Sequence, residues 1–212
     1  MNVSGPWRRA LVLVCMLFCA AGCRGPHPDA LDDRPADTDP QRRYTSAFRT
    51  WTREDRIYSG LALKLIVNAT FRSPAFRQAY SNAYAEIYRL PPTEGRKFWA
   101  DQQRAAGAYH DFVVAAFVPD KQWDDFAEKD SIWRIALVVK DGRRIQPLEI
   151  RKLDKRDAVI QHFYPYASPW KSIYQVRFPV SFPTTGERIL SEPPRDFRLM
   201  VVSVHGSAEM EW

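Results

Sequence analysis

The sequence predicts an α+β fold in which a helical N-terminal segment, about 44–107, packs beside a C-terminal antiparallel β-sandwich, immunoglobulin-like or related. Apolar residues recur at helical spacing in the first segment, whereas apolar and polar residues alternate in the second. Hydrophobic residues form 45% and aromatic residues 13% of the 212 residues, which is enough for a substantial core. We therefore expect 44–108 and 109–212 to form one folded unit.

Three helices are expected in the first segment. Apolar side chains from Tyr44 onward lie roughly at helix spacing, and the first proline after them is Pro74. Ser73 is a favourable cap for a second helix, with Pro74 in its first turn. Pro91 and Pro92 end that helix, and Thr93 is placed to cap a third. Aromatic residues on these helices indicate a core in preference to a ligand surface.

Strands are expected after residue 109, where the pattern changes to alternation. Asp141-Gly142 is typical of a type I′ hairpin turn, and Pro179 indicates an edge position or a bulge. The hairpin is expected to return through 145–153, 159–164 is a shorter candidate strand, and 197–205 is the last strand expected. The alternating apolar residues of the clearest strands are Phe112, Val114, Ala116 and Val118, then Trp133, Ile135, Leu137 and Val139, and then Tyr174, Val176, Phe178, Val180 and Phe182.

The N-terminus has the charged, apolar and small-residue order of a secretory signal. Arg8 and Arg9 precede an apolar run, 10–18, which is followed by small residues at 20–22. This run is about half of the roughly 20 residues that a membrane-spanning helix needs. A cleaved signal is therefore favoured over a permanent transmembrane anchor.

The four residues Ala20-Ala21-Gly22-Cys23 resemble the lipobox of bacterial lipoproteins. The resemblance implies a diacylglyceryl thioether on Cys23, cleavage between Gly22 and Cys23, and handling by the lipoprotein-processing and sorting machinery. Arg24 follows the cysteine, and the lack of Asp there implies the outer membrane of a double-membraned bacterium, with the periplasmic or surface side left open. The alternative is ordinary signal cleavage that leaves an unmodified thiol.

Residues 23–43 are expected to be the lipidated cysteine and a disordered tether. Four prolines and five aspartates occur in 24–43, and Leu31 is its single large aliphatic residue, so the segment cannot offset its ordering entropy. Twenty flexible residues span roughly 25 Å. Cys15 and Cys19 precede the cleavage site, and we therefore expect no disulfide in the fold.

Charge and motifs exclude several function classes. The formal net charge is +6, and removal of a signal containing Arg8 and Arg9 leaves about +4, which is too little to indicate a nucleic-acid partner. The sequence has no Gly-x-Ser-x-Gly elbow, no His-Glu-x-x-His and no phosphate-binding glycine loop. A noncatalytic domain is therefore the leading interpretation.

Two groups of residues could hold a metal ion. Asp120, Asp124, Asp125 and Glu128 offer the oxygen ligands that calcium takes, although a solvated loop is the plainer interpretation. No cofactor is expected beyond this calcium and the covalent lipid. His27 lies in the tether. The other histidines could form a site with Asp111 or Asp196 as orienting partner, or could be structural; they are His110, His162 and His205.

Aromatic and basic residues in the C-terminal half could bind an envelope ligand. Trp170, Tyr164 and Tyr166 fall in expected loops, where they would stack on glycan or peptide or else anchor the loops. A basic cluster could meet lipid headgroups or lipopolysaccharide phosphates, or form a solvated hairpin surface; its members are Lys140, Arg143, Arg144, Arg151, Lys152, Lys155 and Arg156.

These features predict a membrane-anchored envelope lipoprotein whose noncatalytic domain binds or scaffolds another envelope component, either a protein or a glycan. Two alternatives remain open at this point. One is an envelope enzyme or calcium-dependent module that uses the acidic loop 120–130 or the histidines. The other is a glycan- or peptidoglycan-binding module.

Overall fold

The computed structural model describes residues 39–212, which belong to one compact unit. The expected signal peptide, Gly22, Cys23 and His27 lie outside the described residues, as does the expected tether up to residue 38. The α+β class is confirmed, because the described chain combines helices with antiparallel sheets. No helix within residues 39–212 is long and apolar enough to cross a membrane.

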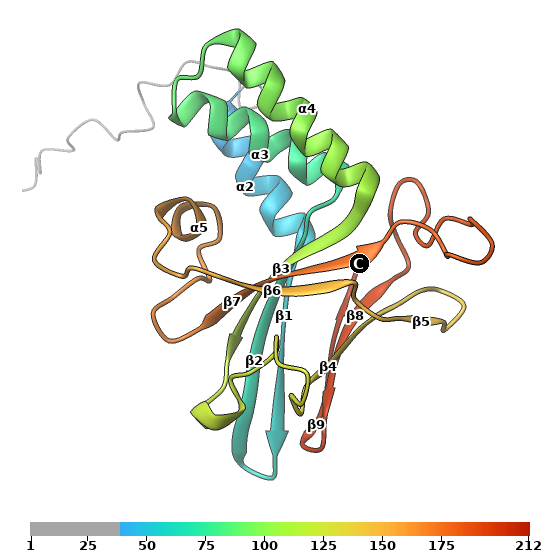
Figure 1. Cartoon of the computed structure of the whole chain (residues 1–212). Coiled ribbons are helices and arrows are strands. Elements are labelled where there is room, and N and C mark those ends of the chain that lie inside the picture. The colour runs from blue at the N-terminus through green and yellow to red at the C-terminus, as the bar shows by residue number, and fades with distance from the viewer. Residues whose placement is uncertain (1–38) are drawn as a thin grey trace, which may run out of the picture. The chain divides into compact units, whose positions relative to one another are not determined.

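Helices occur mainly in the first half of the described chain, whereas strands occur throughout it (Figure 1). The helices are α2 (Pro40–Trp51), α3 (Pro74–Ile87), α4 (Pro92–Ala108), the 3₁₀ turn η2 (Lys121–Trp123) and α5 (Ala158–Phe163). The strands are β1 (Thr52–Ser59), β2 (Ala62–Phe71), β3 (Tyr109–Phe117), β4 (Arg134–Val138), β5 (Arg144–Ile145), β6 (Glu149–Leu153), β7 (Ser172–Pro179), β8 (Arg198–Ser203) and β9 (Gly206–Glu211).

These strands form two antiparallel sheets. A five-stranded sheet has the order β1-β2-β3-β7-β6, and a four-stranded sheet has the order β5-β4-β8-β9. One hydrophobic core contains residues of both sheets, including Phe112 on β3, Val176 on β7, Leu137 on β4 and Leu199 on β8. The predicted alternation of apolar residues on β3, β4 and β7 therefore supplies the buried faces that meet in this core.

A second core lies on the other face of the five-stranded sheet. Val113 and Ala115 of β3 pack there with Phe76 of α3 and Phe163 of α5. The Tyr44 hydroxyl of α2 donates a hydrogen bond to the Phe163 carbonyl, which connects α2 to α5. Figure 1 shows α2, α3 and α4 side by side at one end of the sheets. β3 is consequently buried on both faces.

Residues 52–71 correct the prediction of a continuous helical segment. They form the β1–β2 hairpin, in which Thr52 pairs with Thr70, and only 44–51, 74–87 and 92–107 of the expected segment are helical. Leu65, Val67, Ala69 and Phe71 are all buried on one side of β2. The buried residues of β2 therefore recur with the period of two that is typical of a strand, although the apolar residues of this stretch also match a helical spacing.

Residues 159–164 correct a second prediction, because a short helix replaces the expected strand. Asp157 caps α5 by accepting hydrogen bonds from the backbone N–H groups of Val159 and Ile160. The cap satisfies N–H groups that have no partner within the helix. The C-terminal part of the expected tether is helical as well, since α2 begins at Pro40 and is capped by Asp39.

Turns and caps agree only partly with expectation. Ser73 caps α3 through Phe76 N–H as predicted, but Thr93 does not cap α4, whose N-cap is Pro91.

The turn after β4 is not type I′, since Gly142 has a positive φ of 87° and Asp141 does not. Gly142 N–H donates to Val139 O at 2.8 Å, and Val139 N–H donates to Arg143 O at 3.1 Å. This is a type I turn followed by a glycine bulge.

Pro179 is the last residue of β7, which lies between two neighbours and is not an edge strand. Its partner on β3 is Tyr109, whereas β6 pairs with β7 only as far as Arg177. Pro179 has no N–H to donate, and at this position no residue of β6 is paired with β7 to accept such a hydrogen bond. The alternation that continues to Phe182 overestimates the strand by three residues.

Candidate functional site

The histidines and their proposed partners do not assemble a site. His110 is buried on β3 beside Phe71, whereas Asp111, the next residue, is bound by Arg77 on the opposite side of the strand. Asp196 pairs with Lys140 at 3.2 Å. No group of three His, Cys, Asp or Glu residues within 39–212 is close enough to hold a metal ion. The structure therefore does not bring the histidines together.

His110 remains neutral over most of the pH range. Burial, together with the nearby charge of Arg188, lowers its pKa to about 4. Its Nε2 atom is buried without a hydrogen-bond partner in the described chain. A neutral, enclosed imidazole of this kind contributes to the core and has no geometry for proton transfer to a substrate.

A buried polar network that the sequence did not predict surrounds Asp111. Arg77 of α3 donates to the Asp111 carboxylate, Gln175 Nε2 of β7 donates to it at 3.0 Å, and Arg72 Nη1 lies 3.5 Å from it. Gln102 of α4 accepts hydrogen bonds from both arginines at 2.8 Å. The network joins α3, α4, β3 and β7. Its sequence signal is Asp111 itself, a single acid directly before the apolar run 112–118.

The acidic loop is held by protein donors. Asp120 accepts a hydrogen bond from Gln122 Nε2 at 2.9 Å, Asp125 accepts one from Ser131 Oγ at 2.9 Å, and Asp124 accepts one from Ser172 Oγ at 2.8 Å. Glu128 is exposed. The expected calcium ligands are therefore not gathered around one point, in agreement with the lack of a metal-binding group among the described residues.

A groove beside β6 and β7 combines residues from several of the predicted groups. Its volume is about 380 Å³, which lies in the range of roughly 300–1,000 Å³ that small-molecule sites occupy. Asp124 of the acidic loop, Trp170 of the aromatic group and three members of the basic cluster line it together. The full lining is Lys121, Asp124, Lys152, Leu153, Asp154, Lys155, Arg156, Pro169, Trp170, Ser172 and Ile173. We call it the Trp170 groove.

Trp170 is the most exposed aromatic side chain of the described chain, at 73% of its maximal accessible area. Its backbone is held by lysines on either side: Lys155 Nζ donates to Pro169 O at 2.5 Å, and Lys121 Nζ donates to Trp170 O at 3.4 Å. The loop is closed by Lys171 N–H donating to Ser168 O at 3.1 Å. The indole is therefore presented to solvent on a fixed backbone.

The two tyrosines expected to join Trp170 are not available as a surface. Tyr164 is buried in the helix-side core. The Tyr166 hydroxyl hydrogen-bonds the Thr70 hydroxyl at 2.8 Å and donates to Val113 O at 2.9 Å. Burial raises the pKa of both tyrosines. They anchor the loop after α5, and Trp170 alone of the three is exposed.

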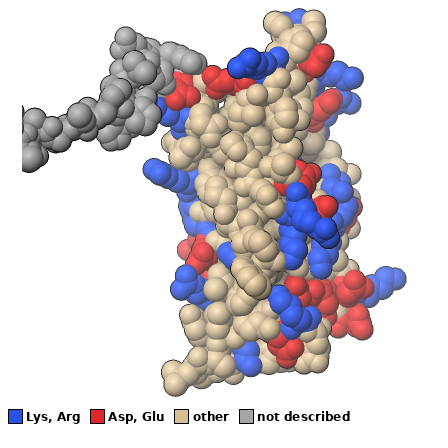
Figure 2. Space-filling model, turned by 90° about the vertical axis from the view of Figure 1, so that its left-hand side faces the viewer, with Lys and Arg blue, Asp and Glu red and all other residues tan. Residues whose placement is uncertain are grey.

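Figure 2 shows the face on which α5 lies, where an uncharged band is bordered by basic and acidic side chains on both sides.

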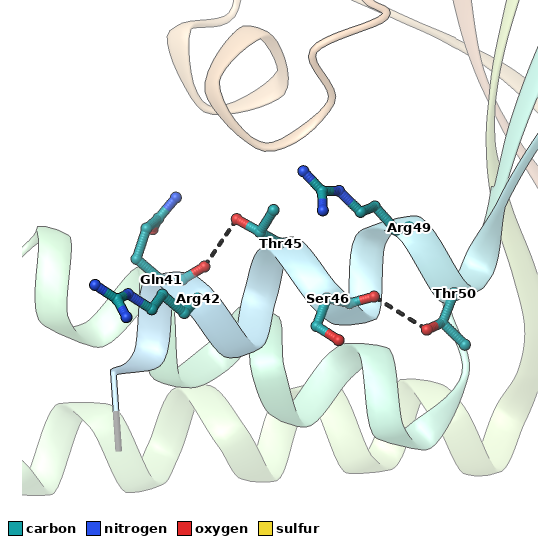
Figure 3. Close-up of a pocket in the computed structure, with 6 residues that line it drawn as sticks. All are labelled: Gln41, Arg42, Thr45, Ser46, Arg49 and Thr50. Carbon is teal, nitrogen blue, oxygen red and sulfur yellow. Dashed lines mark hydrogen bonds between the residues drawn. The ribbon is translucent and has the colours of Figure 1, made fainter. Parts of the chain in front are cut away.

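A second hollow follows the outer side of α2 and has a volume of about 410 Å³ (Figure 3). Two hydroxyls in it already donate to helix carbonyls, Thr45 to Gln41 O at 2.9 Å and Thr50 to Ser46 O at 3.0 Å. No aromatic side chain of residues 39–212 lines this hollow, so these residues offer less to a ligand there than in the Trp170 groove.

No family model and no curated protein matches the chain. A search of solved structures finds a similarity to a crystal structure described as a novel protein of unknown function from Burkholderia pseudomallei K96243. The two chains share 8% identity with a TM-score of 0.40, and the alignment covers 83% of this chain and 86% of the other.

Proposed function

We propose that this chain is the precursor of a lipid-anchored bacterial envelope protein whose folded domain is noncatalytic and binds another envelope component in the Trp170 groove. The observation that carries the proposal is the indole of Trp170, which is 73% exposed above a concave, charged surface. Large aromatic side chains are seldom left in water on a fixed loop, and they dominate binding energy where a ligand covers them.

The anchor is the part of the proposal that rests on sequence. The lipobox-like Ala20-Ala21-Gly22-Cys23 supports lipidation of Cys23, and Arg24 supports sorting to the outer membrane. Two or more acyl chains would hold the protein stably, since one chain binds a membrane only marginally. The segment between Cys23 and Pro40 would then let the domain reach a ligand near the membrane surface.

The fold is proposed to be an immunoglobulin-like or related β-sandwich with helices added to one face. This is supported by two antiparallel sheets that share one core, in which Phe112 and Leu137 belong to different sheets. Sandwiches of this kind commonly bind partners through loops at their edges. The Trp170 groove, formed by the loops around 121–124, 154–156 and 169–172, has such a position.

Retention on envelope material tests the proposal. The chain from residue 23 onward, made soluble by Cys23→Ser, is sedimented with peptidoglycan sacculi and separately with lipopolysaccharide micelles. We expect one of these materials to retain it and Trp170→Ala to weaken retention about tenfold, as loss of a central aromatic contact does. Tyr58→Ala is the matched control, since Tyr58 is also exposed, at 54%, and lies on β1 outside the groove. Equal retention of the Trp170→Ala and Tyr58→Ala variants, or retention on neither material, would contradict the proposal.

A further inference from the structure

Three basic residues of the Trp170 groove differ from Lys140 and Arg143 of the basic cluster, which are ion-paired. At the β4–β5 hairpin, Lys140 pairs with Asp196 at 3.2 Å, and Arg143 pairs with Asp141 at 2.6 Å and with Glu187 at 3.3 Å. Within residues 39–212, by contrast, no carboxylate lies within ion-pair distance of three of the four groove cations. These three are Lys152, Lys155 and Arg156. The groove therefore keeps positive charge of the kind that carboxylates neutralise at Lys140 and Arg143.

The charge balance of the groove favours an anion. Four basic side chains line it, and Asp124 and Asp154 are its acids, which leaves a net charge of +2. Lys121 lies 3.7 Å from Asp124, whose carboxylate also accepts the Ser172 hydrogen bond. Asp154 accepts a hydrogen bond from the backbone N–H of Arg156 at 2.9 Å. Both acids thus have protein donors, and the unpaired charge that faces solvent is positive.

The exposed indole favours a ligand that has a flat, apolar face beside its negative charge, because such a face can pack on the aromatic ring. A pyranose ring presents C–H groups that pack on an aromatic surface, and the neighbouring cations would repel a positively charged ligand. A phosphomonoester carries about −1.5 to −2 charges near neutral pH, close to the charge that the groove leaves unbalanced. Both kinds of side chain in the groove suit phosphate, because lysine binds it as a point charge and the planar guanidinium of arginine can bind two of its oxygens at once.

We propose that the Trp170 groove binds a phosphorylated sugar, with Trp170 stacked on the sugar ring and Lys152, Lys155 and Arg156 around the phosphate. This deepens the proposed function, on which it rests, by naming the chemical class of the ligand. The same chemistry occurs in a soluble sugar phosphate and in a phosphorylated glycolipid headgroup. The experiment therefore includes both sources.

Calorimetric titration of the Cys23→Ser chain with glucose 6-phosphate, glucose and inorganic phosphate tests the recognition. We expect glucose 6-phosphate to bind at least about tenfold more tightly than either of the others, because each lacks one of the two contacts. The double variant Lys152→Gln/Arg156→Gln should lose this preference. Lys140→Gln/Arg143→Gln removes the same charge at the hairpin and should keep it. All four side chains are exposed or paired at the surface, and circular dichroism checks that each variant is folded.

Sedimentation with lipopolysaccharide micelles, before and after enzymatic dephosphorylation, tests the glycolipid source. Binding lost on dephosphorylation would support the proposal, even if glucose 6-phosphate alone were too small to bind. Equal binding to both preparations, tighter binding of glucose than of its phosphate, or comparable binding to phosphatidylglycerol vesicles or a polyglutamate peptide would overturn it. If Trp170→Ala still abolished retention in those cases, the groove would remain a binding site and only its assignment to phosphorylated sugars would fail.

Discussion

Arg77 on α3 donates a hydrogen bond to the carboxylate of Asp111 on β3, and their side chains are only 1% and 2% exposed. Arg72 is a second cation near the same carboxylate. Desolvation by burial and the charge of Arg72 both lower the pKa of Arg77, and Asp111 opposes this shift. The single acid therefore compensates two arginines between the helices and the five-stranded sheet.

Asp111→Asn should destabilise the protein strongly, by about 3 kcal/mol, since removing one partner leaves buried charge uncompensated. Urea unfolding monitored by circular dichroism measures the change. Asp101→Asn is the control, because Asp101 pairs with Arg104 at the exposed surface of α4, where such pairs contribute at most about 1 kcal/mol. Similar unfolding midpoints for the two variants would show that the buried network is not needed for stability.

Stability should fall as the pH is lowered from about 6.5 to 4. The pKa of His110 is about 4 in the folded chain because of burial, whereas an unfolded histidine titrates near 6.5. The unfolded chain therefore binds the proton first as the pH falls, and up to about 3 kcal/mol is lost below the folded pKa. Urea unfolding at several pH values measures the slope. His110→Gln should reduce it, and an equal slope in this variant would contradict the assignment to His110.

Gly206→Ala should destabilise the fold by about 1–2 kcal/mol. Gly206 has a φ of 131°, and an added Cβ would lie 3.1 Å from the Cγ2 atom of Ile57 on β1. Gly107→Ala in α4 meets no atom within 4 Å and should stabilise by up to about 1 kcal/mol, because alanine favours a helix. Thermal melts compare the two. Equal effects would mean that the close approach of β9 to β1 is not a constraint.

Lipidation can be checked at the mature N-terminus. Mass spectrometry of the protein purified from membranes should find a chain that begins at Cys23 and carries diacylglycerol on its sulfur. Cys23→Ser should release the protein from the membrane fraction. A mature chain that starts at another residue, or a free thiol at Cys23, would contradict the anchor while leaving the Trp170 groove untouched.

The sequence predicts the elements whose pattern is unambiguous. Val114 and Ala116 of β3 are buried in the core that the two sheets share, as their alternation predicts. Helix α3 begins at Pro74 and is capped by Ser73, also as predicted. The β1–β2 hairpin is not predicted, because its apolar residues also match helical spacing. The available sequence signal is the dipeptide Ser59-Gly60, and in the structure Gly60 has a φ of 59° in the turn. The cap at Asp157 was the corresponding signal for α5.

The Trp170 groove could be predicted only in its parts. The sequence indicates Asp124 and Trp170 as separate candidates, because they are 46 positions apart. They line one groove because Asp124, directly after η2, accepts a hydrogen bond from Ser172 at the start of β7. Their proximity depends on the strand order and on the hydrogen bond from Ser172 to Asp124. Local periodicity contains no information about either. Which basic residues form ion pairs depends on side-chain positions, so it also could not be predicted from the sequence.

The most direct test of the central claim asks which tryptophan senses the ligand. Indole N–H resonances of the ¹⁵N-labelled Cys23→Ser chain are recorded during addition of soluble oligosaccharide prepared from lipopolysaccharide, with Trp170→Phe used to assign the signal. We predict that the Trp170 resonance shifts and saturates, while that of Trp133, which donates to Trp123 O inside the protein, stays in place. A saturable shift at other tryptophans with Trp170 unmoved, or no shift at any of them, would contradict the assignment of the binding site.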